Sequence, residues 1–240
     1  MKHMLTSALI AGFAAGLLCA LLQYLLVEPD ILLAERYESG ALVHFAATSG
    51  HDQTQTAPAS GAEDQTHQAP ETEDSPILRH TLTVLFSVLT YCGYGLLLLG
   101  AIRLAETTGI KIGPAQALLW GIAGFLTFQM MPALGLAPEL PGTPAADLNA
   151  RQVWWAITAI ATATSLWFIA YGSTHWQRLA GAGVLAAPHI WGAPKLAGFG
   201  GIVPPELAAA FTAHSLGVGL ITWIVLAGVL VRLWHAEPAT

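Results

Sequence analysis

Apolar runs about as long as a bilayer is thick constrain this chain more than any other feature. They cover residues 5–27, 77–103, 114–136, 153–172 and 206–234. A helix needs about 20 such residues to cross the hydrocarbon core, and only helices and closed barrels satisfy every backbone group there. Charged residues make up only 10% of the chain, against about a quarter in a soluble domain. The runs therefore predict an all-α, polytopic membrane protein, with residues 1–240 forming a single transmembrane domain.

A sixth apolar segment, residues 177–194, is short for a span and contains Pro188, His189 and Gly192. It fits a further crossing, and it also fits a broken or re-entrant segment. The predicted number of transmembrane helices is therefore five or six. With six spans, Lys and Arg residues divide five to four in favour of the N-terminal side, which predicts a cytoplasmic N-terminus.

The segment 46–76 differs in kind from the rest of the chain. It is rich in Ala, Thr, Ser, Gln, Pro and acids, and ten of the fifteen acidic residues lie between Glu28 and Asp74. Such a composition cannot bury enough apolar surface to order itself. We therefore expect a long disordered acidic loop on the extracytoplasmic side, directly after the first span.

Residues 128–155 read FQMMPALGLAPELPGTPAADLNARQVWW, with four prolines between two spans. Because proline removes a backbone donor and fixes φ, this connector is not plain helix, and it cannot lie unpaired in hydrocarbon. Trp154 and Trp155 are of the type that settles at the headgroup boundary. The pattern predicts an ordered interfacial loop over 132–152, which buries Leu134, Leu136 and Leu140 against the bundle.

Polar side chains inside a membrane are costly, so each one needs an explanation. Gln129 is followed by two methionines and Pro132, and His189 follows Pro188. Interrupted membrane segments are where transporters build ion sites, although His189 also fits an interfacial histidine bonded to a neighbouring helix. For Gln23 we expect an ordinary hydrogen bond between helices.

Other candidate ligands come from residue type. His44 follows Glu35, and imidazole with carboxylate attracts divalent cations. His214 is either a third inward ligand or, as we favour, a hydrogen-bonding residue of the bundle. The candidate metal ligands are thus His189, His44, Glu35, Gln129 and His214. Convergence of Gln129, His189 and His214 on one cavity would favour transport, and their dispersal would favour a scaffold.

Motifs for covalent or nucleotide chemistry are absent from the sequence: it contains no Walker A loop, dinucleotide fingerprint, HExxH or GxSxG. We therefore expect no enzyme activity, no tightly bound cofactor and no nucleic-acid partner. Cys19 and Cys92 lie within apolar runs and are interpreted as small hydrophobic residues.

Three stretches carry a resemblance to a known family: LLVEPDILLAERYE, the proline-rich 128–155 segment, and APHIWGAP. On these the chain resembles the CbtA family of predicted cobalt transporters over essentially its whole length, although residues 46–76 match no motif. The resemblance implies a bacterial inner-membrane subunit for cobalt uptake, linked to cobalamin synthesis. It also implies a small single-span, histidine-bearing partner of the CbtB type.

Two functions follow as hypotheses. The first is inward movement of Co²⁺, for which ligand type alone does not exclude Ni²⁺. The alternative is a membrane accessory or assembly protein that organises the small partner and has no permeation path of its own.

Overall fold

The computed structural model describes residues 2–43, 75–196, 198 and 201–236. The described residues form helices and their connections, without strands, which confirms the all-α prediction. The helices are α1 (Lys2–Leu22), η1 (Gln23–Val27), α2 (Glu28–Glu38), α3 (Pro76–Thr107), η2 (Pro114–Gln116), α4 (Ala117–Phe125), η3 (Leu126–Met130), α5 (Met131–Ala133), α6 (Leu148–Tyr171), α7 (His175–Trp191) and α8 (Pro205–His235).

Two of the long helical segments each contain one π-helical turn between two α-helical parts. The π-helical turn η1 joins α1 to α2, and the π-helical turn η3 joins α4 to α5. In each, the backbone N–H that follows the turn bonds five residues back: Glu28 to Gln23, and Met131 to Leu126. Periodicity in the sequence contained no sign of either turn.

Four helices are long and apolar enough to cross a membrane: His3–Glu38, Ile77–Thr107, Leu148–Tyr171 and Pro205–His235. By this measure the predicted count of five or six is too high. The predicted span at 114–136 corresponds to the α4–α5 run, which η3 interrupts. The sixth candidate is α7, a continuous helix of 17 residues, and so it is neither broken nor long.

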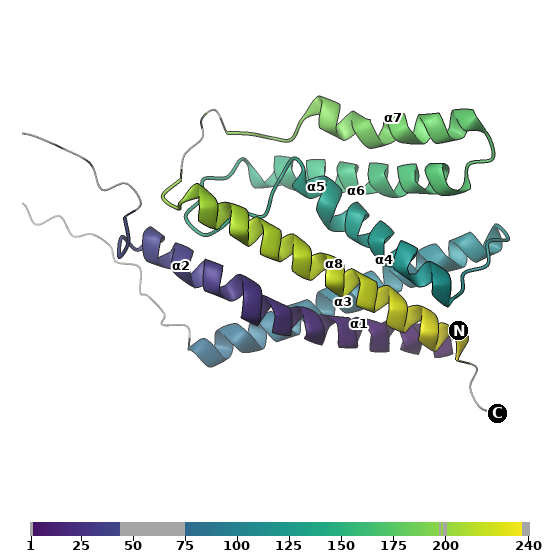
Figure 1. Ribbon diagram of the computed structural model, residues 1–240, viewed down its shortest axis with the longest axis horizontal. Helices are drawn as coiled ribbons and strands as arrows, with labels where there is room; N and C mark the ends of the chain where they lie inside the picture. Colours follow the sequence, from purple (N-terminus) through teal and green to yellow (C-terminus); the bar gives the residue numbers. More distant parts are fainter. Residues whose placement is uncertain (1, 44–74, 197, 199–200, 237–240) are drawn as a thin grey trace, which may run out of the picture.

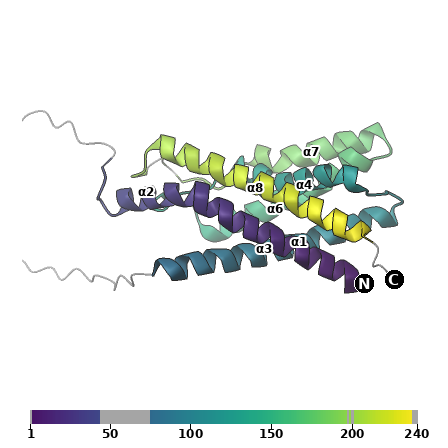
Figure 2. The ribbon, with the colours of Figure 1, turned by 60° about the horizontal axis from the view of Figure 1, so that its bottom comes forward.

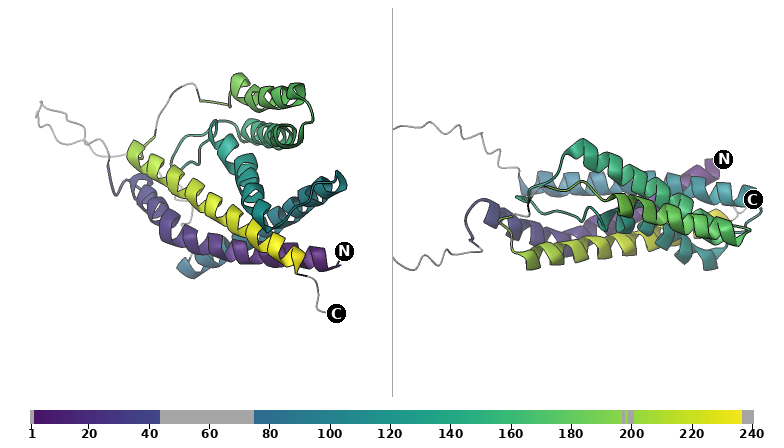
Figure 3. Two further views of the ribbon diagram at one scale, coloured as in Figure 1. Left: turned by 45° about the vertical axis from the view of Figure 1, so that its right-hand side comes forward. Right: turned by 90° about the horizontal axis from the view of Figure 1, so that it is seen from above.

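The helices pack in a fixed order. α7 lies on α6, α6 contacts α5 and η3, α4 packs on α8, α8 on α1, and α1 on α3; Figures 1 and 3 show this sequence of neighbours. The start of α1 and the end of α8 lie together (Figure 2), and we call this the terminal end. The opposite connector end holds α2, the 134–147 loop and the starts of α3 and α8 (Figure 1).

Small residues allow α1 and α3 to approach closely. A Cβ atom added to Gly12 would lie 2.5 Å from the Cα of Cys92, and one added to Gly16 would lie 2.5 Å from the Cα of Val88. Ala8 and Ala15 on the same face are fully buried. Backbones that approach this closely gain dispersion contacts, which drive helix association where lipid removes the hydrophobic effect.

Gly12→Leu is therefore expected to destabilise the bundle by about 1–3 kcal/mol, the usual range for overpacking. The measurement is thermal unfolding in detergent. Gly93→Leu is the matched control, because Gly93 is exposed on α3 and a Cβ there would meet no described atom within 4 Å. Equal melting temperatures for the two variants would show that the close α1–α3 contact contributes little.

The proline-rich connector is ordered and partly matches its prediction. Leu140 is buried as expected, whereas Leu134 is 61% exposed, which corrects that part of the prediction. Trp154 does not lie at an exposed boundary, as its residue type had indicated. It is buried, packs over Gly135, and donates its Nε1–H to the Pro188 carbonyl at 3.3 Å. Trp155 remains exposed. The first tryptophan thus fixes the connector to α7.

The predicted acidic loop lies outside the described residues, apart from Ser75 and Pro76 at its end. Ser75 begins the next helix, because its side-chain oxygen accepts a hydrogen bond from the Leu78 N–H. The description of the chain as one transmembrane domain stays a prediction.

Candidate functional site

Each of the two π-helical turns carries a glutamine. Gln23 opens η1, and Gln129 lies within η3. The Gln23 Oε1 accepts a hydrogen bond from the Ser87 hydroxyl on α3 at 3.3 Å, which confirms the predicted bond between helices. Single π turns within α-helices are often found at functional sites, so their coincidence with the two interior amides marks this region.

Two cavities border these glutamines. The first, of about 850 Å³, extends toward the connector and the start of α6. The second, of about 570 Å³, extends along the first half of α3. Both are lined by Gln23, Gln129, Ser215 and Val218. We call these four residues the junction. Three of them carry uncharged polar side chains, and all four lie where the two cavities meet the same residues in a largely apolar bundle.

The amide of Gln129 spans the distance from η3 to α8. Its Oε1 is buried and has no hydrogen-bond partner among the described residues. The end of the side chain occupies the space beside Gly219 that a Cβ atom on that residue would fill. The Tyr91 hydroxyl lies within reach of Gln129, Cys19 and Thr222, so the surroundings of the amide are polar but uncharged.

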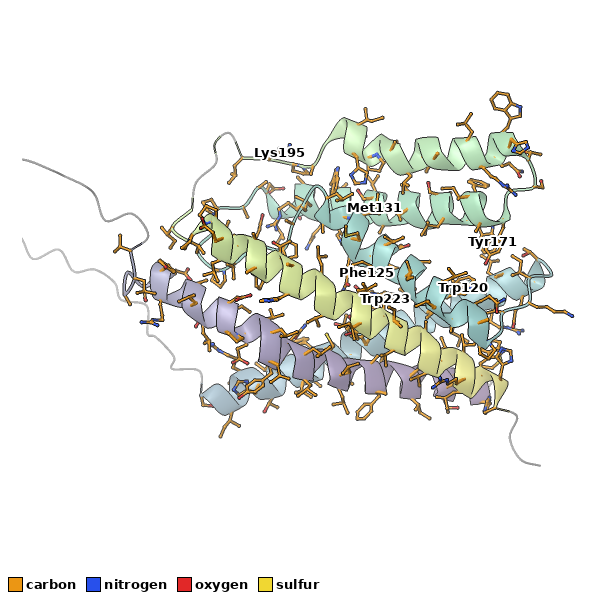
Figure 4. All side chains as sticks on the ribbon, in the orientation of Figure 1. Trp120, Phe125, Met131, Tyr171, Lys195 and Trp223 are labelled. Carbon is orange, nitrogen blue, oxygen red and sulfur yellow. The ribbon has the colours of Figure 1, made fainter. Side chains whose placement is uncertain are left out.

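An aromatic layer lies beside the junction. Phe128 and Trp223 stack with ring centroids 5.6 Å apart and planes 2° apart, and Tyr94 lies 4.8 Å from Trp223. Phe128 lines the first cavity and Tyr94 lines the second. Trp223 follows Gly219 by one turn of α8 toward the terminal end, at the crossing with α4 (Figure 4). The stacked rings therefore fill the space between α3, η3 and α8 on that side.

Carboxylates paired with basic residues gather at the connector end. Asp30 Oδ2 lies 2.7 Å from His214 Nδ1 and joins α2 to α8. Three further pairs lie at this end: Glu28–His80 at 3.6 Å, Glu35–Arg79 at 3.2 Å and Glu139–Arg151 at 2.6 Å. Of these residues, Glu139 and Arg151 line the first cavity and Arg79 lines the second, whereas the junction contains only neutral groups.

The predicted metal ligands do not form one cluster. Gln129 lines both cavities, whereas His214 is paired with Asp30 and lines neither cavity. Glu35 is paired with Arg79, and His44 lies outside the described residues. Within the described ranges, no three His, Cys, Asp or Glu side chains are grouped to hold a metal ion.

His189 lies apart from the junction, in the last turn of α7. Its ring is edge-on to Trp154, with centroids 5.9 Å apart. Its Nε2 is buried without a partner in the part of the chain that the structure describes. Gln129, His189 and His214 are therefore dispersed and do not converge on one cavity, the arrangement that favours the scaffold function over transport.

Sequence reasoning missed Ser215, Gly219 and Trp223, which all lie on α8. Each reads as an ordinary residue of an apolar helix, because its importance depends on what η3 places opposite it. Asp30 was visible as an acid beside a membrane span, but its partner lies 184 residues away.

The fold defines a class: a helical membrane protein with neutral polar groups between two cavities of its bundle. A family model described as "Probable cobalt transporter subunit (CbtA)" matches residues 1–235. The chain therefore belongs to the CbtA family. Comparisons with curated proteins and with solved structures gave no match.

Proposed function

We propose that this chain moves Co²⁺ inward through the interior of its own bundle. The observation that supports this most is the pair of cavities that border the same four junction residues. The carboxylates and basic residues at the connector end would meet the ion first, and the aromatic layer would close the path behind the junction. The ion is cargo, and no covalent step is involved.

Neutral oxygen donors suit a site that an ion must leave. Conduction requires binding that is favourable enough for the ion to be taken up and weak enough for its release. Amide and hydroxyl oxygens at the junction offer such binding, because they carry no net charge. These donors do not separate Co²⁺ from Ni²⁺, which binds most sites somewhat more tightly, so the choice of cobalt is taken from the family.

The finer assignments belong to the same proposal. The chain would act in the inner membrane of a bacterium with its N-terminus in the cytoplasm, and its uptake would supply cobalamin synthesis. Its partner would be a small single-span protein of the CbtB type that carries histidines.

One observation favours a second candidate function, that of an accessory protein that organises the small partner. His189 and His214 lie away from the junction, so the candidate histidines build no common site with Gln129. In that case the partner would hold the permeation path.

Cobalt accumulation separates the two functions. Cells expressing the chain alone, the partner alone and both together are compared for cell-associated cobalt, with nickel as competitor. Transport by this chain predicts accumulation in cells that lack the partner, further increased when the partner is present. Accumulation by the partner alone, unchanged by this chain, would overturn the proposal.

His189 also remains a proposed ligand, because its buried Nε2 has no described partner. His189→Ala is expected to lower cobalt accumulation about tenfold, at the lower end of what loss of a metal-site contact costs. The amount of protein in the membrane should change less. His175→Ala, exposed at the opposite end of α7, is the control. Accumulation equal to that of the control would remove His189 from the path.

A further inference from the structure

We propose that Gly219 of α8 is a positioning residue, which holds the side chain of Gln129 across the bundle interior as an oxygen ligand for a partly hydrated divalent cation. This inference rests on the proposed function, because it names the ligand atom at the junction and the residue that places it.

The geometry of the contact is specific. Gln129 begins on η3, and its amide ends over the Cα of Gly219 on α8. A Cβ atom added to Gly219 would overlap the Gln129 Oε1, and it would lie 2.7 Å from Cδ and 3.0 Å from Nε2. The whole amide group therefore occupies the space that any other residue at position 219 would fill. At Gly217, two residues earlier, a Cβ atom would meet no described atom within 4 Å.

The amide is poorly explained as a packing element. Its Oε1 is buried without a partner among the described residues, and an acceptor left in this state destabilises the folded protein. An apolar side chain of similar size would fill the same space without that cost. The last side-chain torsion of glutamine is soft, so the oxygen can turn from Gly219 toward either cavity. A cation at the junction would supply the missing partner.

The groups around Gln129 determine how much of its water shell a bound cation would keep. The groups near Gln129 are neutral: the Gln23 amide, the Ser215 hydroxyl and the Tyr91 hydroxyl. A divalent ion held only by neutral oxygens keeps part of its water shell, and cavities of about 850 and 570 Å³ leave room for it. Such a site favours passage over tight retention.

The test is a double-mutant cycle on Co²⁺ binding, measured by equilibrium dialysis on the full-length chain in lipid nanodiscs. Gly219→Ala displaces the amide and is expected to weaken Co²⁺ binding roughly 10- to 100-fold, as loss of a supporting contact does at metal sites. Gln129→Asn should also weaken binding, because its amide is too short to reach α8. In the double variant the shorter side chain clears the new methyl group, so it should bind like Gln129→Asn alone, and the losses of the two single variants should not add.

Gly217→Ala is the matched control and should bind like the wild type. The atoms nearest the new methyl group belong to the Gln129 amide, which is the far end of a flexible side chain, so Gly219→Ala should fold. Thermal unfolding of each variant checks this. Wild-type affinity in Gly219→Ala would overturn the inference, and so would losses of affinity in the two single variants that add in the double variant.

Co²⁺ binding and cobalt accumulation together separate the positioning role of Gly219 from transport by the chain. Binding that follows the predicted cycle, in a chain that gives cells no added cobalt, supports the positioning role of Gly219 and overturns transport. Cobalt accumulation by cells that is equally strong in wild type and Gly219→Ala overturns the positioning role and leaves transport standing.

Discussion

Ser215→Trp is expected to reduce cobalt accumulation to the level of cells that lack the chain. Ser215 lies on α8 and lines both cavities. An indole group there would fill the junction from the side opposite Gln129, and an ion that keeps part of its water shell would find no room. Because Ser215 borders open space and is only half-buried, the larger side chain has a place to go without displacing the core.

Gly217→Trp controls for this substitution. Gly217 is exposed on the same helix, and a Cβ atom added there meets no described atom within 4 Å, so its indole would point away from the junction. The measurement is cell-associated cobalt normalised to the amount of each variant in the membrane. Equal accumulation by the two variants would mean that the cavities are not the route.

Gln129→Leu is expected to have opposite effects on uptake and stability. Uptake should fall strongly, because the junction loses the amide that extends from η3 to α8 and lines both cavities. The free energy of unfolding should rise by about 1 kcal/mol, since leucine removes a buried acceptor that has no described partner. A polar group that lowers stability and supports activity is the pattern expected of a functional residue.

Gln152→Leu makes the same chemical change at the outer part of the first cavity, where the side chain is exposed. It should change neither uptake nor melting temperature appreciably. If Gln129→Leu instead lowers the melting temperature and uptake together, the amide is a structural element of the bundle and the ligand role fails.

Most of the fold was predictable because apolar length and proline placement are local properties. The long helices α1, α3, α6 and α8 coincide with predicted runs, and the connector is ordered as its prolines indicated. The predicted number of transmembrane helices was too high because two apolar segments do not form long helices. The α4–α5 run is interrupted by η3, and α7 is a regular helix that is shorter than a span.

The site was less predictable, because its parts are brought together by packing between distant segments. Gln129 was identified from its chemistry alone, as a polar group in an oily run. Gly219 and Ser215 could be recognised only when α8 was placed against η3 and α1. For His214 the favoured interpretation, a hydrogen-bonding residue of the bundle, is confirmed by its contact with Asp30 on α2, although the sequence could not name that partner.

The most direct test of transport by this chain is Co²⁺ entry into liposomes that contain the purified protein, alone and with its small partner. An inward Co²⁺ gradient is applied and quenching of an enclosed metal-sensitive dye is followed over time. We expect influx that depends on the chain, falls to the rate of empty liposomes in Ser215→Trp, and persists in Gly217→Trp. Influx that occurs with the partner alone, or that is unchanged by Ser215→Trp, would contradict a path through the junction.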